Sequence, residues 1–312
     1  MPFRKIFFYA SFFLTVNSAS AQNDCPKEPP VPTQEQMVEM RKNAKDRGFL
    51  WKITKNGKTS HLYGSIHLSK MDWRVPGAVT MQAVRQSDAL AFELNLQDPE
   101  AQKILKVQHT NSPASELPPK LKDRIARLPA SNCLSTSDWA SLAPETKVAY
   151  LSGLPILMAG YHQGYGIELV FTAIANRMRK PILAIETVQE QMAALVPINP
   201  SQALISYEKL VASIEAGTSN SVTFKTLKTW AESDFTTLNS YADWCQCMIS
   251  VDDKLQMKKI LDDRNVVMAE RIDKLNLQYR SVFAAVGSLH MVGETGLPKL
   301  FEKLGYTVER VF

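Results

Sequence analysis

The sequence lacks the features that mark nucleic-acid-binding proteins and several common enzyme classes. Its formal net charge is only +5 over 312 residues, and no basic stripe alternates with aromatic residues, so we expect no nucleic-acid partner. It contains no His-Glu-x-x-His zinc helix, no Gly-x-Ser-x-Gly nucleophile elbow and no glycine-rich phosphate loop. The sequence therefore lacks the main signals of the usual serine hydrolases and of nucleotide-dependent enzymes.

Long apolar runs are absent except near the N-terminus. Arg4 and Lys5 precede the eleven apolar residues from Ile6 to Val16, and a small-residue Ala-Ser-Ala ends at Ala21. This pattern is typical of a secretory signal peptide. A membrane anchor is less favoured, because eleven residues cannot cross roughly 30 Å of hydrocarbon as a helix. We expect cleavage of residues 1–21, and a secreted or periplasmic chain with no transmembrane helix.

Cysteine is scarce, with four residues in the chain: Cys25, Cys133, Cys245 and Cys247. In an exported protein an even number predicts two disulfides, with three possible connectivities. Cys245 and Cys247 are so close in sequence that we expect each to pair with a distant partner. The alternative, a Cys-x-Cys metal site, has no nearby histidine to complete it.

The rest of the chain has the length and apolar content of one large domain or two small ones. Residues 22–33 hold four prolines and predict an extended tail before a domain over residues 34–312. Thr33 and Gln36 resemble a capping box that opens a helix through about Asp46. No repeat of 20 to 50 residues is visible, so a solenoid is not expected.

Two strand-like runs, Phe49 to Lys55 and Thr59 to Ile66, are joined by Asn56-Gly57. This dipeptide predicts a two-residue hairpin turn. The implied register places Trp51 opposite Leu62, on the face that we expect to be buried.

Four more runs have the character of strands: Ala89 to Leu94, Pro181 to Ile185, Val282 to Val286 and Tyr306 to Val311. Helical periodicity fills most of the remainder, including Leu121 to Leu128, Glu145 to Leu151, Ile167 to Met178 and Asp253 to Leu275. The middle of the chain is largely helical. The fold class is therefore α+β, or α/β-like: a central mixed sheet wrapped by many helices.

Four of the predicted strands end at a residue suited to catalysis. These residues are His67, Glu93, Glu186 and His290. If the strands lie side by side, two imidazoles and two carboxylates meet at one edge of the sheet, where ligand sites of open sheets are usually found.

Two of these histidines close the same tetrapeptide, Gly64-Ser65-Ile66-His67 and Gly287-Ser288-Leu289-His290. Glycine allows an unusual backbone conformation or close approach, serine donates a hydrogen bond, and histidine supplies a metal ligand or a general base. One copy alone would more simply be a glycine turn beside a satisfied histidine. Two copies among five histidines favour a shared polar site whose His and carboxylate groups suit a divalent ion.

Arg264 falls in the middle of the apolar stripe of the predicted helix from Asp253 to Leu275, with Asn265 at its edge. A buried arginine requires a carboxylate or an anionic ligand. Arg264 is therefore either a clamp on a glutamate or substrate carboxylate, or a side chain whose head reaches water. Glu168, at the start of another predicted helix, is explained by the helix dipole.

Four blocks of the sequence, in order, resemble the TraB/PrgY/GumN family, which includes the Tiki proteases. They are the Trp-containing hairpin ending in Leu62-Tyr63-Gly64-Ser65-Ile66-His67, Lys180-Pro181 through Gln191, Asp263-Arg264-Asn265, and Val286 through Arg310. The resemblance covers roughly residues 49–311. It implies a fold with pseudo-symmetric halves, related to erythromycin-esterase and ChaN-like proteins.

In Tiki proteins the two Gly-x-x-His motifs and a glutamate are tied to metal-dependent peptide hydrolysis. Carried over by position, this implies that His67, His290 and Glu93 bind a divalent metal ion, manganese or cobalt rather than zinc, with Glu186 in support.

We therefore expect a metal-dependent, peptidase-like hydrolase with a peptide or protein substrate. The residues expected to act in catalysis are Glu93, Glu186 and Arg264, supported by Gly64, Ser65, Gly287, Ser288 and Asn265. Two alternatives stay open: a metal-free, esterase-like hydrolase that uses His and Glu as base and acid, and a non-enzymatic protein that sequesters a peptide.

Overall fold

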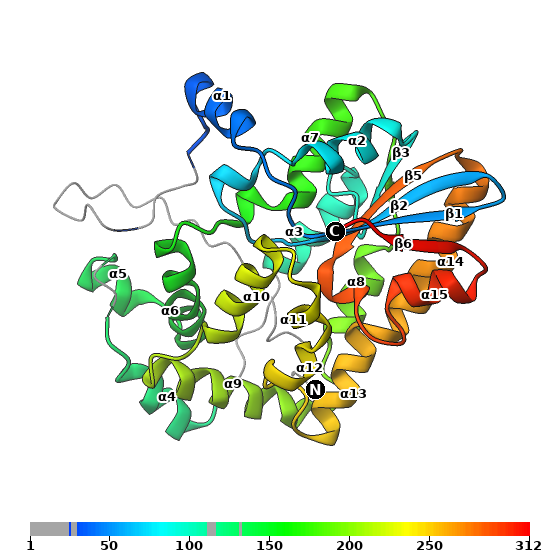
Figure 1. Cartoon of the computed structure of the whole chain (residues 1–312). Helices are drawn as coiled ribbons and strands as arrows, with labels where there is room; N and C mark the ends of the chain where they lie inside the picture. Colours follow the sequence, from blue (N-terminus) through cyan, green and yellow to red (C-terminus); the bar gives the residue numbers. More distant parts are fainter. Residues whose placement is uncertain (1–24, 26–29, 111–116, 131–132) are drawn as a thin grey trace.

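The structure, a computed structural model, describes residue 25 and residues 30–110, 117–130 and 133–312 (Figure 1). The expected signal peptide, residues 1–21, lies outside the described residues. Within the described part of the chain, every helix is too short or too polar to cross a membrane.

A six-stranded mixed sheet forms the centre of the fold, with the strand order β4-β3-β5-β2-β1-β6. The strands are β1 (Phe49–Lys55), β2 (Lys58–Ser65), β3 (Ala89–Phe92), β4 (Ile182–Ala184), β5 (Val282–Gly287) and β6 (Thr307–Arg310). The four strands from β4 to β2 are parallel, whereas β1 is antiparallel to both of its neighbours. The predicted α+β class with a mixed sheet is confirmed.

The hairpin of β1 and β2 has the predicted register, with Trp51 opposite Leu62. Asn56 and Gly57 both adopt left-handed conformations, with φ of 51° and 74°. Two consecutive residues with positive φ match the right-handed twist of the strands, which is why Asn-Gly suits this turn.

The described helices that follow the predicted periodicity include α1 (Gln34–Lys42), α4 (Pro119–Ala126), α6 (Pro144–Met158) and α7 (Ile167–Met178). Other helices are α2 (Ala78–Gln86), α3 (Pro99–Thr110), α5 (Thr136–Ser141), α8 (Val188–Leu195), α9 (Pro200–Glu215), α10 (Ser221–Ala231), α11 (Phe235–Asn239), α12 (Tyr241–Trp244) and α15 (Leu297–Lys303). Short 3₁₀ turns cover Met71–Trp73, Gln163–Tyr165 and Ser288–Met291.

The helix predicted from Asp253 to Leu275 is two helices, α13 (Val251–Ile260) and α14 (Asp262–Gln278), so the prediction of one continuous helix was wrong. The break is at Leu261, where the carbonyl oxygen of Ile260 accepts a hydrogen bond of 3.0 Å from Nη1 of Arg264. A side chain that reaches back to a carbonyl at a helix end can replace a missing backbone donor.

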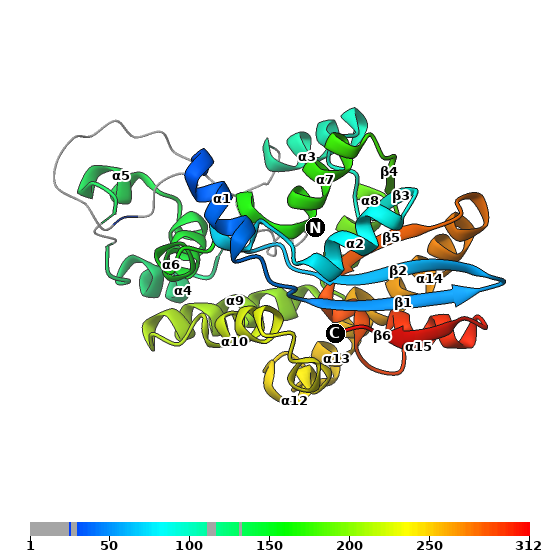
Figure 2. The same ribbon diagram turned by 45° about the horizontal axis from the view of Figure 1, so that its top comes forward.

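Helices cover both faces of the sheet, with α2 and α7 on one side and α14 and α15 on the other (Figures 1 and 2). On the first face Tyr63, Phe171 and Phe283 pack as one aromatic group, with ring centroids 5.0 to 5.6 Å apart. On the second face Met268 and Phe301 are fully buried. Burial of this apolar area is the main favourable term that holds the layers together.

A second, smaller apolar cluster joins α4, α6 and α9 beside the sheet (Figure 2). Its buried members are Leu117, Leu121, Ile125, Leu128, Val148, Tyr207 and Val211. The largely helical middle of the chain thus has a core of its own.

Two disulfides are present, as predicted, but the expected pairing of Cys245 and Cys247 with distant cysteines was wrong. Cys25 pairs with Cys133, and Cys245 pairs with Cys247. Gln246, between the last two, has a left-handed φ of 57°. This turn brings the two Cα atoms to 5.1 Å, a separation that a disulfide can span.

Candidate functional site

The carboxyl ends of the four parallel strands meet at one edge of the sheet, as the sequence predicts. Ser65 of β2 is aligned with Gly287 of β5, and Phe92 of β3 with both Ala285 of β5 and Ala184 of β4. The contact between β3 and β4 continues past the ends of both strands, because the amide of Glu186 donates a hydrogen bond of 2.9 Å to the carbonyl of Glu93.

Glu93 lies at the centre of the site and is only 6% exposed. Its Oε1 atom accepts a hydrogen bond of 2.7 Å from the Gly287 amide, and its Oε2 atom accepts 2.8 Å bonds from Gln191 and Arg264. Burial opposes ionisation of Glu93, but the neighbouring histidines, Arg264 and the Gly287 amide outweigh it and lower the pKa to about 2. Glu93 is therefore a carboxylate at neutral pH.

Arg264 holds both glutamates. Its Nε and Nη2 atoms donate to the two oxygens of Glu186 over 2.9 and 2.6 Å, in the bidentate arrangement that favours arginine over lysine. Its side chain is 11% exposed. Of the two alternatives for Arg264, the geometry is that of a clamp on glutamates, not of a head group in water. Burial raises the pKa of Glu186, although Arg264 opposes this.

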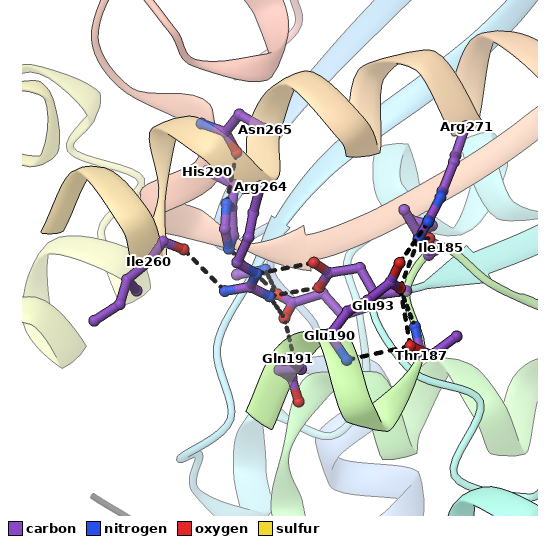
Figure 3. A network of polar contacts seen from close by, with 12 residues as sticks. Glu93, Ile185, Thr187, Glu190, Gln191, Ile260, Arg264, Asn265, Arg271 and His290 are labelled. Atoms are coloured by element: carbon purple, nitrogen blue, oxygen red, sulfur yellow. Dashed lines mark hydrogen bonds and ion pairs between the residues drawn. The ribbon is translucent and has the colours of Figure 1, made fainter. Parts of the chain in front are cut away.

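An outer ring of contacts fixes helix α8, which carries Gln191 (Figure 3). Thr187 and Glu190 form a capping box at the start of α8. Arg271 of α14 donates to both oxygens of Glu190 and to the carbonyl of Ile185. These contacts direct Gln191 toward the central carboxylate.

His290 is almost completely buried and has a defined tautomer. Asn265 donates from Nδ2 to the carbonyl of Thr295, so its oxygen faces Nδ1 of His290 at 2.6 Å. Because an amide oxygen only accepts, Nδ1 of His290 carries the proton. Burial lowers the pKa of His290 to about 4, so Nε2 has a free lone pair at neutral pH. That atom lies 3.8 Å from Oε1 of Glu93.

His67 has different surroundings. Its side chain is 65% exposed, and Nδ1 lies 3.2 Å from Oε1 of Glu168, a carboxylate that is only 14% exposed. Ser65 donates a hydrogen bond to the same oxygen. The charge of Glu168 raises the pKa of His67, and His67 with Ser65 lowers the pKa of Glu168 despite its burial. The helix dipole is therefore an incomplete explanation of Glu168, which contacts a predicted site residue.

The glycines of the two motifs permit close approach. A Cβ atom on Gly287 would lie 3.2 Å from Oε1 of Glu93, and one on Gly64 would lie 3.2 Å from the Cα of Ser288. Neither glycine is among those with positive φ. These positions therefore require glycine because neighbouring atoms approach the backbone closely, and not because the backbone has an unusual conformation.

The structure thus joins Glu93, Glu186, Arg264, Asn265 and His290 in one network of polar contacts (Figure 3). His67 instead forms a pair with Glu168. Across the described residues, no three or more His, Cys, Asp or Glu side chains are gathered closely enough to hold a metal ion.

Two residues of the site were missed by the sequence reasoning, Glu168 and Gln191. Gln191 lies in α8, the helix that follows β4, and the capping box of Thr187 and Glu190 is a sequence signal that marks the start of that helix. Glu168 had a weaker signal, its position directly after Gly166 at the start of a helix.

Comparison with known proteins gives one match. The sequence matches the TraB/PrgY/gumN family over residues 49–310. No curated protein and no solved structure matches the chain. The matched region contains the whole network and both Gly-Ser-x-His motifs, and it spans most of the sequence. The chain belongs to the TraB/PrgY/gumN family.

Proposed function

We propose that the protein is a metal-dependent hydrolase that acts on peptides, with a divalent ion held by His67, His290 and Glu93. Support comes from the donor types, because imidazole nitrogen and carboxylate oxygen are the usual ligands of catalytic divalent ions. The resemblance to Tiki proteins favours manganese or cobalt over zinc.

One observation carries the proposal: two hydrogen-bond acceptors face each other without a proton between them. Nε2 of His290 has no proton because Nδ1 carries it, and Oε1 of Glu93 belongs to a carboxylate. They are 3.8 Å apart, inside the protein. Oε1 of Glu93 already accepts a hydrogen bond from the Gly287 amide, and a donor or a cation close to both atoms would use its second lone pair together with that of Nε2. A divalent ion satisfies both at once.

When bound there, a divalent ion would supply Lewis-acid activation of the scissile carbonyl and of water. The protein's own groups have separate tasks in the proposal. Arg264 and Gln191 hold Glu93 ionised and in place. Glu186 takes a proton from the attacking water and returns it to the leaving amine, a task that suits a carboxyl whose pKa is raised by burial.

A metal-free hydrolase is the second candidate, and the pair of His67 and Glu168 favours it. A histidine whose Nδ1 faces a carboxylate is the arrangement of a general base with its orienting group. In this alternative Nε2 of neutral His67 takes the proton of water, and because the charge of Glu168 raises the pKa of His67 to about 10, this base form predominates only at alkaline pH. The exposed position of His67 leaves it accessible to a substrate.

The test is elemental analysis of the purified protein, refilled with manganese, cobalt or zinc, beside a variant with both His67→Ala and His290→Ala. The matched control is His61→Asn, which removes a buried histidine four residues before Ser65 in β2. Each protein is then incubated with a peptide library, and products are identified by mass spectrometry.

The proposal predicts close to one ion per chain in the wild type and the control, little in the double variant, and peptide cleavage that follows the metal content. Cleavage that survives complete chelation would replace it with the metal-free hydrolase. Tight peptide binding without any product would replace it with a peptide-sequestering protein.

We also propose that the chain is exported. Two disulfides support this, because such bonds persist mainly in oxidising compartments. Fractionation of cells that express the full chain, beside a chain that begins at Gln22 after an initiating methionine, tests it. Recovery of both chains only in the cytosol would contradict the proposal.

A further inference from the structure

Glu168 lies directly behind His67 and is more buried than the histidine that it contacts. Its carboxylate is 14% exposed, whereas the imidazole is 65% exposed. The same oxygen, Oε1, lies 3.2 Å from Nδ1 of His67 and accepts a hydrogen bond from Ser65. Two donors on one oxygen keep the carboxylate turned toward the histidine and away from water.

The backbone around His67 is fastened to the segment that carries Glu168. The amide of Ile167 donates to the carbonyl of Ile66 over 3.1 Å, and Ser69 and His162 exchange backbone bonds of 3.2 and 2.8 Å. A Cβ atom on Gly166 would lie only 2.8 Å from the carbonyl oxygen of His67. The start of α7 is thus packed against the His67 loop, and a larger residue at position 166 would separate them.

The direction of the contact fixes which nitrogen of His67 faces away from Glu168. A carboxylate accepts hydrogen bonds, so Nδ1 carries the proton that faces Glu168. The ring then presents Nε2 on its opposite side. A carboxylate behind a ligand histidine typically sets its tautomer and orientation and makes it more basic. On His290 the neutral amide of Asn265 occupies the corresponding place.

We propose that Glu168 is a positioning residue of this site: it holds the Nδ1 proton of His67, with Ser65 keeping its carboxylate in place, so that Nε2 is directed to the metal ion. The inference rests on the proposed function for the metal, but the orientation of His67 can be measured without one. It adds to the site a carboxylate that follows no strand of the sheet.

The competing explanation is that Glu168 only stabilises the first turn of α7 through the helix dipole. Two substitutions separate the explanations. Glu168→Gln keeps the shape and removes the charge. Glu168→Asp keeps a negative charge at the helix start but withdraws it from His67 by one methylene group. Under the dipole explanation Glu168→Asp resembles the wild type, whereas under the proposal it resembles Glu168→Gln.

The experiment measures Mn²⁺ affinity by calorimetry for the wild type, both Glu168 variants and Ser65→Ala. Glu35→Gln is the matched control, since Glu35 is an exposed acid in the first turn of α1. We expect Mn²⁺ to bind about 10- to 100-fold more weakly to both Glu168 variants, less strongly affected binding in Ser65→Ala, and no change in the control. Wild-type affinity in both Glu168 variants would overturn the proposal.

A second readout does not depend on metal. In metal-free protein labelled with ¹⁵N-histidine, the His67 signals are assigned by their loss in His67→Gln. We expect the Nδ1 and Nε2 shifts of His67 to follow pH differently once Glu168 is replaced by Gln, while the His290 shifts stay as they are. Unchanged His67 signals would overturn the proposal. If the wild type binds no Mn²⁺ yet the His67 signals change, the proposed metal function fails and the positioning role stands.

Discussion

The two Gly-Ser-x-His motifs are nearly identical in sequence and differ sharply in structure. His290 is 3% exposed, and a neutral amide, Asn265, holds its Nδ1 atom. His67 is 65% exposed, and a carboxylate, Glu168, lies at its Nδ1 atom. The pKa of His290 is lowered by burial, whereas that of His67 is raised by the charge of Glu168.

A motif of this kind places an imidazole but does not determine its chemistry. The partner of Nδ1 does that, and it comes from a helix distant in sequence: α14 for His290 and α7 for His67. A neutral partner in a buried place gives a rigid, uncharged ligand. An anionic partner near solvent gives a more basic group on the side that a substrate can reach.

The largest expected effect concerns Arg264, which lies with His290 in the buried part of the site. Arg264→Met leaves Glu93 and Glu186 as buried carboxylates without their shared cation, so we expect the free energy of unfolding to fall by about 3–5 kcal/mol. Arg271→Met is the control, since the side chains of its pair with Glu190 are 35% and 44% exposed and the pair should contribute no more than about 1 kcal/mol. Chemical denaturation measures both.

Equal losses of stability in Arg264→Met and Arg271→Met would contradict this expectation, because the central network would then depend on its cation no more than a surface pair does. Arg264→Lys tests whether the shape of the guanidinium is needed as well as its charge. A single ammonium cannot reproduce the bidentate contact with Glu186 together with the bond to Glu93, so lysine should restore only part of the loss.

The two histidines should affect acid stability with opposite sign. In metal-free buffer, His290 takes up a proton near pH 4 in the folded protein and near pH 6.5 when unfolded. The unfolded state therefore binds more protons between these values, and the free energy of unfolding falls as the pH falls, by up to roughly 1.4 kcal/mol per pH unit for one proton. His67, with a raised folded pKa, stabilises the fold below pH 6.5 and loses that contribution as the pH rises.

Denaturation at several pH values between 6.5 and 4 measures the slope for the wild type and His290→Asn. His61→Asn is a useful reference, because burial lowers the pKa of His61 to about 4 as well, away from the motif histidines. Each substitution should reduce the slope of the free energy of unfolding against pH by up to roughly 1.4 kcal/mol per pH unit, the contribution of one proton. An unchanged slope in His290→Asn would show that His290 is not a neutral buried histidine.

The glycines of the motifs provide a smaller test. A Cβ atom on Gly64 would meet the backbone of Ser288, which has little room to move, so Gly64→Ala should cost about 1–3 kcal/mol. A Cβ atom on Gly287 would meet the carboxylate of Glu93. Gly287→Ala should therefore weaken Mn²⁺ binding more than Gly64→Ala does, whereas Gly64→Ala should lower the free energy of unfolding more. Calorimetry and denaturation of both variants check this, and the reverse ranking would contradict it.

Much of this site could be predicted from the sequence, because its residues follow strands whose hydrophobic runs are clear. The runs before His67, Glu93, Glu186 and His290 predicted four strands, and the structure shows that these strands are parallel, which brings their carboxyl ends to one edge. Arg264 could be found because a cation in an apolar stripe requires a partner.

The remainder depends on tertiary contacts that no local pattern encodes. Glu168 faces away from the apolar stripe of its own helix, yet the backbone bond from Ile167 to Ile66 turns its carboxylate toward His67. Periodicity could not locate the break at Leu261, since the stripe continues across it. The bond between Cys245 and Cys247 depends on the left-handed conformation of Gln246, for which the sequence carries no glycine or asparagine signal.

The smallest effect on stability should come from replacing His67, the exposed histidine of the site. His67→Gln removes an imidazole that is 65% exposed, and solvent screens its attraction to Glu168, so the free energy of unfolding should change by about 1 kcal/mol or less. His290→Gln breaks a buried bond to Asn265 and should cost about 1–3 kcal/mol. Both variants should lose Mn²⁺ binding and peptide cleavage alike. Denaturation beside calorimetry decides the point: if His67→Gln destabilises the protein as much as His290→Gln does, the contrast between an open and a buried histidine is wrong. If only His290→Gln loses the metal, His67 acts on the substrate alone.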